Sequence, residues 1–345
     1  MRTCLVHIGT HKTGTTSLQV LVEQNRATLQ EAGLLITRTA RPSFAQTGNH
    51  QLGWDLLVHG ESRDLPLLTQ ELRASPVDAA LVTSEDICLI YSRPATIQML
   101  ADAIRAAGYA GKVVIYLRPQ APYAESMYVE RIKHDYIRPL SGYIDRILQT
   151  GMYVPDGSPI QIEFRYPRLL EPWVRVFGPE NVIIRAYEAG QPNEFIFQDF
   201  LRLIALAAPG FGRSPLQLSV SHPRANESLT FGTLLDTAYQ KLLPQGVPQA
   251  EPRALLRTHV PSFSEALLNE RFALFSRDET LSLLRAFAPD NEVLARDYGV
   301  NLAFRTENDV PPAGDPVWEK AAVERAIFDR LLQLWMETRD ALSSQ

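Results

Sequence analysis

The chain has 345 residues, of which 45% are hydrophobic and 21% are charged, and its formal net charge at pH 7 is −5. A globular chain of this length can bury one large core, alone or with a smaller helical lobe. The acidic balance argues against a protein that wraps nucleic acid, because binding to the phosphate backbone needs a basic face. No run of about 18 apolar residues and no secretory signal pattern occurs, so we expect a cytoplasmic protein without a transmembrane segment.

Five short runs are nearly continuous in apolar residues, which is typical of strands covered on both faces. They span residues 3–9, 33–37, 79–84, 112–118 and 181–187. Helical spacing between them predicts helices at residues 15–32, 62–74, 94–107, 121–135 and 165–177. The alternation predicts an α/β fold, a three-layer parallel β-sheet with flanking helices.

After residue 193 the spacing of apolar residues is helical and no strong strand follows. We therefore expect residues 1–205 to form the α/β core and residues 206–345 to form a helical extension of the same domain. The two cysteines, Cys4 and Cys88, lie in apolar strand-like runs, which predicts buried free thiols rather than a disulfide or a metal site.

The first predicted strand leads into the sequence HKTGTTS at residues 11–17. Gly9 and Gly14 have the spacing of the P-loop G-x-x-x-x-G-K-[ST], in which a lysine follows the second glycine. Here Thr15 occupies the lysine position, and the cation is Lys12, inside the loop. Such a loop still forms an anion site, because backbone N–H groups and the positive end of the helix dipole point outward. The alternative is a plain turn in which a threonine only caps the helix.

The run at residues 11–17 resembles the 5′-phosphosulfate loop of the sulfotransferases, which use 3′-phosphoadenosine 5′-phosphosulfate (PAPS) as their donor. The resemblance implies the P-loop-like fold of the bacterial sulfotransferases and no metal requirement. The family usually has proline where this chain has His11, a departure that concerns the stiffness of the loop more than its chemistry. The positions that the resemblance assigns to donor binding are Lys12, Thr13, Gly14, Thr15, Thr16 and Ser17.

A second match concerns Arg118, at the tip of the fourth predicted strand, and Ser126 on the following helix. Their spacing is similar to the sulfotransferase 3′-phosphate signature, an arginine at a strand end and a serine eight residues later. An arginine fork and a serine hydroxyl are suitable partners for phosphate oxygens. Taken singly, each residue is more often a surface side chain. Tyr187, after the last core strand, is predicted to stack on the adenine ring. The Arg-Lys-Gly clamp of cytosolic sulfotransferases is absent.

Sulfuryl transfer also needs a base for the acceptor proton. Glu85 follows the third strand, at the sheet edge where parallel sheets present ligands, and aligns topologically with the catalytic histidine of cytosolic sulfotransferases. The competing interpretation is a capping or surface glutamate. His50, in the Gly- and Asn-containing loop after the second strand, is the rival base, since an imidazole titrates near neutral pH. Lys12 is expected to stabilise the leaving oxygen.

These features together predict an enzyme that transfers a sulfuryl group from PAPS to a hydroxyl or amine of an acceptor. The similarity to bacterial relatives favours a saccharide or glycoconjugate acceptor, recognised by the helical extension and the loop at residues 38–60. Two alternatives stay open. One is a nucleotide kinase or NTPase with an aberrant P-loop, and the other is a nucleotide-binding protein without catalysis. The sequence does not define the oligomeric state.

Overall fold

The computed structural model describes residues 2–42, 47–133, 139–187, 193–212, 216–220, 230–242, 265–302 and 307–343. Within it the chain divides into two compact units, each built from segments that are distant in sequence. The first unit comprises residues 1–118, 157–226 and 290–302, and the second comprises residues 119–156, 227–289 and 303–345. The core at residues 1–205 and the helical extension at residues 206–345 stay a prediction from the sequence.

A five-stranded, wholly parallel sheet forms the centre of the first unit. The strand order is β2-β3-β1-β4-β7. The strands are β1 (Thr3–His7), β2 (Leu34–Ile36), β3 (Ala79–Thr83), β4 (Ala110–Leu117) and β7 (Val182–Ala186). All five predicted strands and their parallel arrangement are therefore confirmed. Because His7 lies opposite Thr83 and Val114, the carboxyl ends of β1 and β3 reach the same edge of the sheet.

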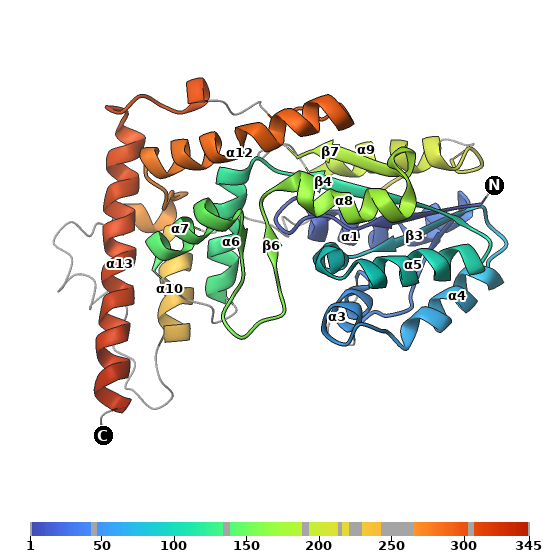
Figure 1. Cartoon of the computed structure of the whole chain (residues 1–345), viewed down its shortest axis with the longest axis horizontal. Helices are drawn as coiled ribbons and strands as arrows, with labels where there is room; N and C mark the ends of the chain where they lie inside the picture. The colour runs from blue at the N-terminus through green and yellow to red at the C-terminus, as the bar shows by residue number, and fades with distance from the viewer. Residues whose placement is uncertain are drawn as a thin grey trace. The chain divides into compact units, whose positions relative to one another are not determined.

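Helices cover both faces of this sheet. One face packs against α1 (Thr15–Gln24), α2 (Arg26–Glu31) and α9 (Asn193–Ala207), whose apolar residues share a core cluster with alternate residues of the strands. The other face packs against α5 (Pro94–Ala106) and α8 (Tyr166–Phe177), with α4 (Asp64–Ala74) beside α5 (Figure 1). The predicted three-layer α/β architecture is thus confirmed.

The strands alternate their side chains between the two helical layers. Leu5 belongs to the cluster with α1 and α9, whereas Cys4 and Val6 face the opposite layer, and all three are fully buried. Burying an aliphatic side chain of this size stabilises the fold by about 1.5–3 kcal/mol. Both cysteines are free and buried, as predicted, and burial raises the pKa of Cys4 and of Cys88 to about 12.

The helix predicted at residues 15–32 is two helices, because Asn25 interrupts it. The Asn25 side chain donates to the carbonyls of Leu21 and Ser219, each at 2.8 Å, and its Oδ1 accepts from the Ser219 N–H at 2.7 Å. An asparagine that satisfies backbone groups of another segment competes with the helical ladder. The pattern of apolar residues gives no sign of this distant partner.

A helix also lies where the sequence predicts a loop, at residues 38–60. Helix α3 (His50–Val58) buries Leu52, Leu56 and Leu57 and packs against the 3₁₀ helix η1 (Glu85–Ser92). The three leucines have helical spacing, but Gly53 within the helix obscures the signal, since glycine is a poor helix former. The remaining short elements of this unit are β6 (Ile162–Glu163) and η2 (Pro179–Asn181).

The second unit is mostly helical. Its elements are α6 (Gln120–Lys133), α7 (Leu140–Thr150), β5 (Met152–Tyr153), α10 (Phe231–Leu242), η3 (Glu265–Asn269), η4 (Glu307–Asp309) and α13 (Pro316–Ser343), while α12 (Arg277–Tyr298) contributes to both units. Helix α10 packs on α6 and α13. The Tyr143 hydroxyl donates to the Ala124 carbonyl at 2.9 Å, and the Tyr128 ring lies edge-on to Phe328.

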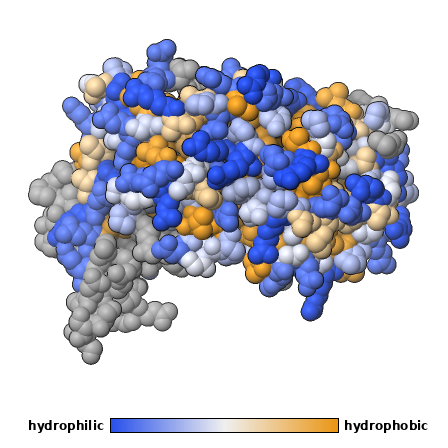
Figure 2. Space-filling model, in the orientation of Figure 1, coloured by the Kyte–Doolittle hydropathy of each residue, from blue (hydrophilic) through white to orange (hydrophobic). Residues whose placement is uncertain are grey.

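No helix among the described residues is long and apolar enough to cross a membrane. The face displayed in Figure 2 carries mainly hydrophilic residues with hydrophobic ones scattered between them. The large apolar side chains that are exposed in the described part of the chain include Trp54, Leu67, Phe195 and Leu206. Single exposed apolar residues of this kind are ordinary on protein surfaces.

Candidate active site

The loop between β1 and α1 has the geometry of an anion site. Gly14 is the N-cap of α1, with φ 75°, and no side chain caps the helix. The helical ladder begins with the Leu18 N–H, which donates to the Gly14 carbonyl at 2.9 Å. The N–H groups of the first turn precede that ladder, and with the helix dipole they favour an anion at this end.

The backbone of the loop is strained at its lysine. Lys12 has φ 63°, in the left-handed region that side-chain-bearing residues rarely adopt. Conformations of this kind cost of order 1–3 kcal/mol and occur preferentially at functional sites. The Lys12 carbonyl accepts a hydrogen bond from Arg118 Nη1 at 3.4 Å, which fixes this peptide to the end of β4.

Threonine hydroxyls hold the rest of the loop. The Thr13 hydroxyl donates to the Thr10 carbonyl at 2.6 Å, and the Thr10 hydroxyl donates to the Tyr116 carbonyl at 3.0 Å. Thr13, Thr15 and Ser17 are buried, whereas Thr16 is exposed. The hydroxyl of Thr13 is thus a brace of the loop, and the exposed hydroxyl of the run is that of Thr16.

Arg118 and Tyr187 lie beside the same loop. A Cβ built on Gly14 would come within 2.6 Å of Ile196 Cδ1 and 3.4 Å of the Tyr187 ring, and the φ of 75° is one that side-chain-bearing residues rarely adopt, so both features favour glycine here. The Arg118 guanidinium carbon is 5.9 Å from the centre of the Tyr187 ring, within the range of a cation–π contact. The Tyr166 hydroxyl donates to the Arg118 carbonyl. The structure therefore brings together Lys12, Gly14, Arg118 and Tyr187.

Ser126 lies on α6, in the second unit, and is half-buried. Arg118 is the last residue of the first unit. The pairing of these two residues around a phosphate therefore stays a prediction from their spacing.

The other sequence-predicted residues lie at the end of β3. The Ser84 N–H donates to the His7 carbonyl at 3.0 Å, which joins the ends of β3 and β1. Asn49, the N-cap of α3, is fastened to the same place, because its N–H donates to the Thr83 carbonyl and its Oδ1 accepts from the Thr83 N–H at 2.9 Å. His50, the first residue of α3, is thereby placed beside Glu85 and Asp86.

Asp86, which the sequence reasoning missed, is the centre of this group. Its Oδ2 is 2.8 Å from His50 Nδ1, and its Oδ1 is 3.3 Å from His11 Nε2. The Ser84 hydroxyl lies 3.1 Å from His50 Nδ1 and accepts from the Asp86 N–H. A signal was present in the sequence, since Asp86 directly follows Glu85 at a strand end, but its partners come from two other segments.

These contacts shift two pKa values. Burial lowers the pKa of His50, but the hydrogen bond to Asp86 and the negative charges of Glu85 and Asp86 outweigh it, and the pKa lies above its ordinary value of 6.5. Burial raises the pKa of Asp86, but hydrogen bonds from His11 and His50 and their positive charge bring it well below its ordinary value of 3.8. Each group thus favours the charged form of the other, imidazolium on His50 and carboxylate on Asp86.

Glu85 has a different partner. Its Oε2 accepts a hydrogen bond from Gln19 Nε2 at 2.7 Å, and Gln19 is a buried residue of α1. The two bases proposed from the sequence thus lie in one neighbourhood, next to the loop that carries Lys12. His7 is buried beneath this edge with Nδ1 2.9 Å from the Thr83 hydroxyl, and burial lowers its pKa to about 3, so its ring is neutral.

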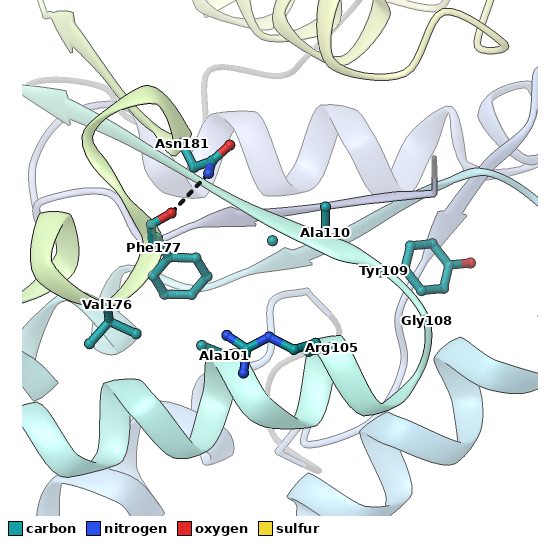
Figure 3. A pocket seen from close by; sticks show the side chains of 9 residues that line it. Ala101, Arg105, Gly108, Tyr109, Ala110, Val176, Phe177 and Asn181 are labelled. Carbon is teal, nitrogen blue, oxygen red and sulfur yellow. Dashed lines mark hydrogen bonds between the residues drawn. The ribbon is translucent and has the colours of Figure 1, made fainter.

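A cavity in the described part of the chain lies elsewhere (Figure 3). It has a volume of about 380 Å³ and lies at the amino end of β4, between the ends of α5 and α8. Tyr109, Phe177, Arg105 and Asn181 line it, and none of the residues predicted for the donor or the base does. No group of three or more His, Cys, Asp or Glu that could hold a metal ion is found among the residues that the structure describes.

No protein-family model matches the sequence, and a search of curated proteins returns no match. Among solved structures, the chain is similar to the sulfotransferase from Alicyclobacillus acidocaldarius, with 17% sequence identity and a TM-score of 0.42. The similarity covers 88% of this chain and 98% of that one.

Proposed function

We propose that this chain is a sulfotransferase that moves a sulfuryl group from PAPS to an acceptor hydroxyl or amine. The observation that carries the proposal is the position of Lys12. It lies inside a strand–loop–helix anion site, on a strained peptide that Arg118 holds, and not after the second glycine where an ATP-binding loop needs its lysine.

The loop suits the 5′-phosphosulfate end of such a donor. The first-turn N–H groups of α1, from Thr15 to Ser17, would bind the 5′-phosphate, together with the exposed hydroxyl of Thr16. Lys12 would neutralise the charge that grows on the bridging oxygen as the sulfuryl group leaves. Transfer of this type depends mostly on positioning and electrostatic stabilisation, as phosphoryl transfer does.

Arg118 and Tyr187 suit the nucleotide end. The guanidinium offers paired donors to the 3′-phosphate, and Ser126 would add a neutral donor eight residues further along the chain. Tyr187 follows β7 and lies against both Gly14 and Arg118, so its ring is near enough to the loop to stack on the adenine. The acceptor proposed from the sequence is a saccharide or a glycoconjugate.

Calorimetric titration with 3′-phosphoadenosine 5′-phosphate tests the donor site without any knowledge of the acceptor. ADP, with and without magnesium, serves as the control ligand. Lys12→Ala should weaken binding of both nucleotides about 10- to 100-fold, the loss expected for a hydrogen bond to a charged group. Arg118→Ala and Ser126→Ala should remove the preference for the 3′-phosphate. Arg105→Ala is the matched control, because Arg105 is exposed on α5 and its ion pair is with the exposed Asp102 of the same helix.

Equal affinity for both nucleotides in wild type would refute the proposal. A preference for ADP with magnesium would instead favour a kinase or NTPase. A protein that binds 3′-phosphoadenosine 5′-phosphate but does not produce it from PAPS with any acceptor would instead be a nucleotide-binding protein without catalysis.

A further inference from the structure

One carboxylate holds two imidazoles next to the proposed donor loop. Each oxygen of Asp86 has its own histidine, Oδ1 with His11 Nε2 and Oδ2 with His50 Nδ1. His11 belongs to the loop itself and directly precedes Lys12, whereas His50 begins α3. The cluster therefore connects the lysine loop to the end of β3.

The carboxylate itself is rigidly placed. Asp86 lies in the first turn of η1, its N–H donates to the Ser84 hydroxyl at 3.1 Å, and only 12% of its side chain is exposed. Helix α3 approaches so closely that a Cβ on Gly53 would lie 2.7 Å from the Asp86 carbonyl carbon. The backbone of Asp86 is thus confined from the α3 side, which leaves the side chain little freedom to leave its two partners.

The two histidines differ in what their second ring nitrogen can do. His50 Nδ1 is shared by Asp86 and Ser84, and its Nε2 lies so close to Gly48 that a Cβ built there would be 2.5 Å away. His11 is held only through Nε2. Its Nδ1 makes no hydrogen bond to the part of the chain that the structure describes.

We infer that His11 is the catalytic base that takes the acceptor proton, and that Asp86 is its positioning residue, with His50 fixing the other oxygen of that carboxylate. This inference rests on the proposed sulfotransferase function. It assigns the base to the loop residue adjacent to Lys12, in place of Glu85 or His50.

The transfer step balances with these groups. The acceptor oxygen forms a bond to sulfur while the bond from sulfur to the bridging oxygen breaks, and the electron pair stays on the 5′-phosphate, where Lys12 stabilises it. The acceptor proton moves to His11 Nδ1. The imidazolium formed there donates Nε2–H to Asp86, as a histidine does in other carboxylate–histidine pairs. His11 then returns the proton to water, and the sulfated acceptor and 3′-phosphoadenosine 5′-phosphate leave.

The charges around His11 come from three elements. Asp86 and Glu85 on η1 are carboxylates, His50 on α3 is an imidazole held by Asp86, and Lys12 follows in the loop. Glu85 accepts from Gln19, so one of its oxygens is committed to α1. A carboxylate flanked by two imidazoles also explains why Asp86 has a lowered pKa without a lysine or arginine beside it in the contacts described.

The test measures release of 3′-phosphoadenosine 5′-phosphate from PAPS, with water and with a saccharide panel as acceptors, across pH. The variants are His11→Gln, Asp86→Asn and Glu85→Gln. His59→Gln and Glu61→Gln are matched controls, since both residues are exposed just after α3. Affinity for 3′-phosphoadenosine 5′-phosphate, measured by calorimetry, reports separately on the donor site.

We expect His11→Gln to lower turnover about 10²- to 10⁴-fold, the usual contribution of a general base, with bisphosphate affinity within about twofold of wild type. Free imidazole should partly restore turnover in His11→Ala. Asp86→Asn should lower turnover less and leave bisphosphate affinity within about twofold of wild type, because the base loses only its positioning partner; a residue that merely supports the fold would lower turnover and bisphosphate affinity together.

Three results would overturn the inference. In the first, His11→Gln turns over normally while Glu85→Gln does not, which makes Glu85 the base. In the second, His11→Gln loses turnover and bisphosphate affinity in parallel, which makes His11 a support of the donor loop. In the third, wild type binds the bisphosphate but turns over no donor. Failure of wild type to bind the bisphosphate at all would instead refute the proposed function.

Discussion

Two helical glycines, Gly53 and Gly142, should respond in opposite directions to replacement by alanine. Gly53 lies in α3, and a Cβ there would be 2.7 Å from the Asp86 carbonyl carbon and 2.8 Å from the Ile87 nitrogen. Gly142 lies in α7, and a Cβ there would meet no atom within 4 Å. Both substitutions make the same chemical change within a helix, so the difference between them reports the packing of α3 on η1.

The magnitude follows from two opposing effects. Alanine is favoured over glycine inside a helix by about 0.8–1.0 kcal/mol, which alone would stabilise both variants. At Gly53 the methyl must move about 0.7 Å to reach ordinary contact with backbone atoms, an overpacking that typically costs about 1–3 kcal/mol. We therefore expect Gly53→Ala to lower the free energy of unfolding by about 1 kcal/mol, and Gly142→Ala to raise it by about 0.5–1 kcal/mol.

Urea unfolding followed by circular dichroism measures both free energies, each read from the transition of the unit that carries the glycine. Gly53→Ala should also weaken the contact of His50 with Asp86, because α3 must retreat from η1. A Gly53→Ala protein that is as stable as wild type, or more stable, would refute the close approach of these two elements. Destabilisation by Gly142→Ala would show that the helix preference of alanine over glycine is not the baseline from which the effect of Gly53→Ala should be worked out.

Three further predictions concern strain, charge and burial. Lys12→Gly should be more stable than Lys12→Ala by about 1 kcal/mol in urea titrations, since only glycine adopts a positive φ without cost. Both variants should lose donor affinity. Equal stability of the two variants would contradict the backbone strain at this position. The free energy of unfolding lost in His50→Gln should be largest between about pH 4.5 and 6.5 and shrink as pH rises further. The reason is that the raised pKa of His50 stabilises the fold below its unfolded value of 6.5, and the lowered pKa of Asp86 does so above 3.8. A loss that does not shrink above about pH 6.5 would contradict the ion pair. Native protein should resist maleimide at pH 8, whereas protein in urea should react at Cys4 and Cys88, as mass spectrometry would show; labelling of the native protein would contradict their burial.

Much of the first unit could be predicted because its strands are buried on both faces. Such strands consist almost wholly of apolar residues, so their positions and their parallel pairing follow from short runs separated by helices. The anion loop could be predicted for a similar reason, since Lys12 and Gly14 are neighbours in the sequence and act through local backbone geometry.

The cluster around Asp86 could not be predicted, because its members come from three separate segments. His11 and His50 are 75 and 36 residues from Asp86 in the sequence, and they meet it only through the pairing of β1 with β3 and the docking of α3. Helix α3 was itself missed on account of Gly53, a residue that is required by close packing and that also weakens the helical pattern.

The braces on Thr10 and Thr13 have a consequence for how fast a ligand can bind. Their hydroxyls hold the loop through carbonyls of the loop and of β4, so these bonds do not depend on a bound anion. A loop that is already ordered loses little conformational entropy on binding, and no slow closure of this segment has to precede the chemistry. The arrival of an anion at α1 would then be governed by diffusion and by the electrostatic field at the helix end, with a salt dependence that follows from that field.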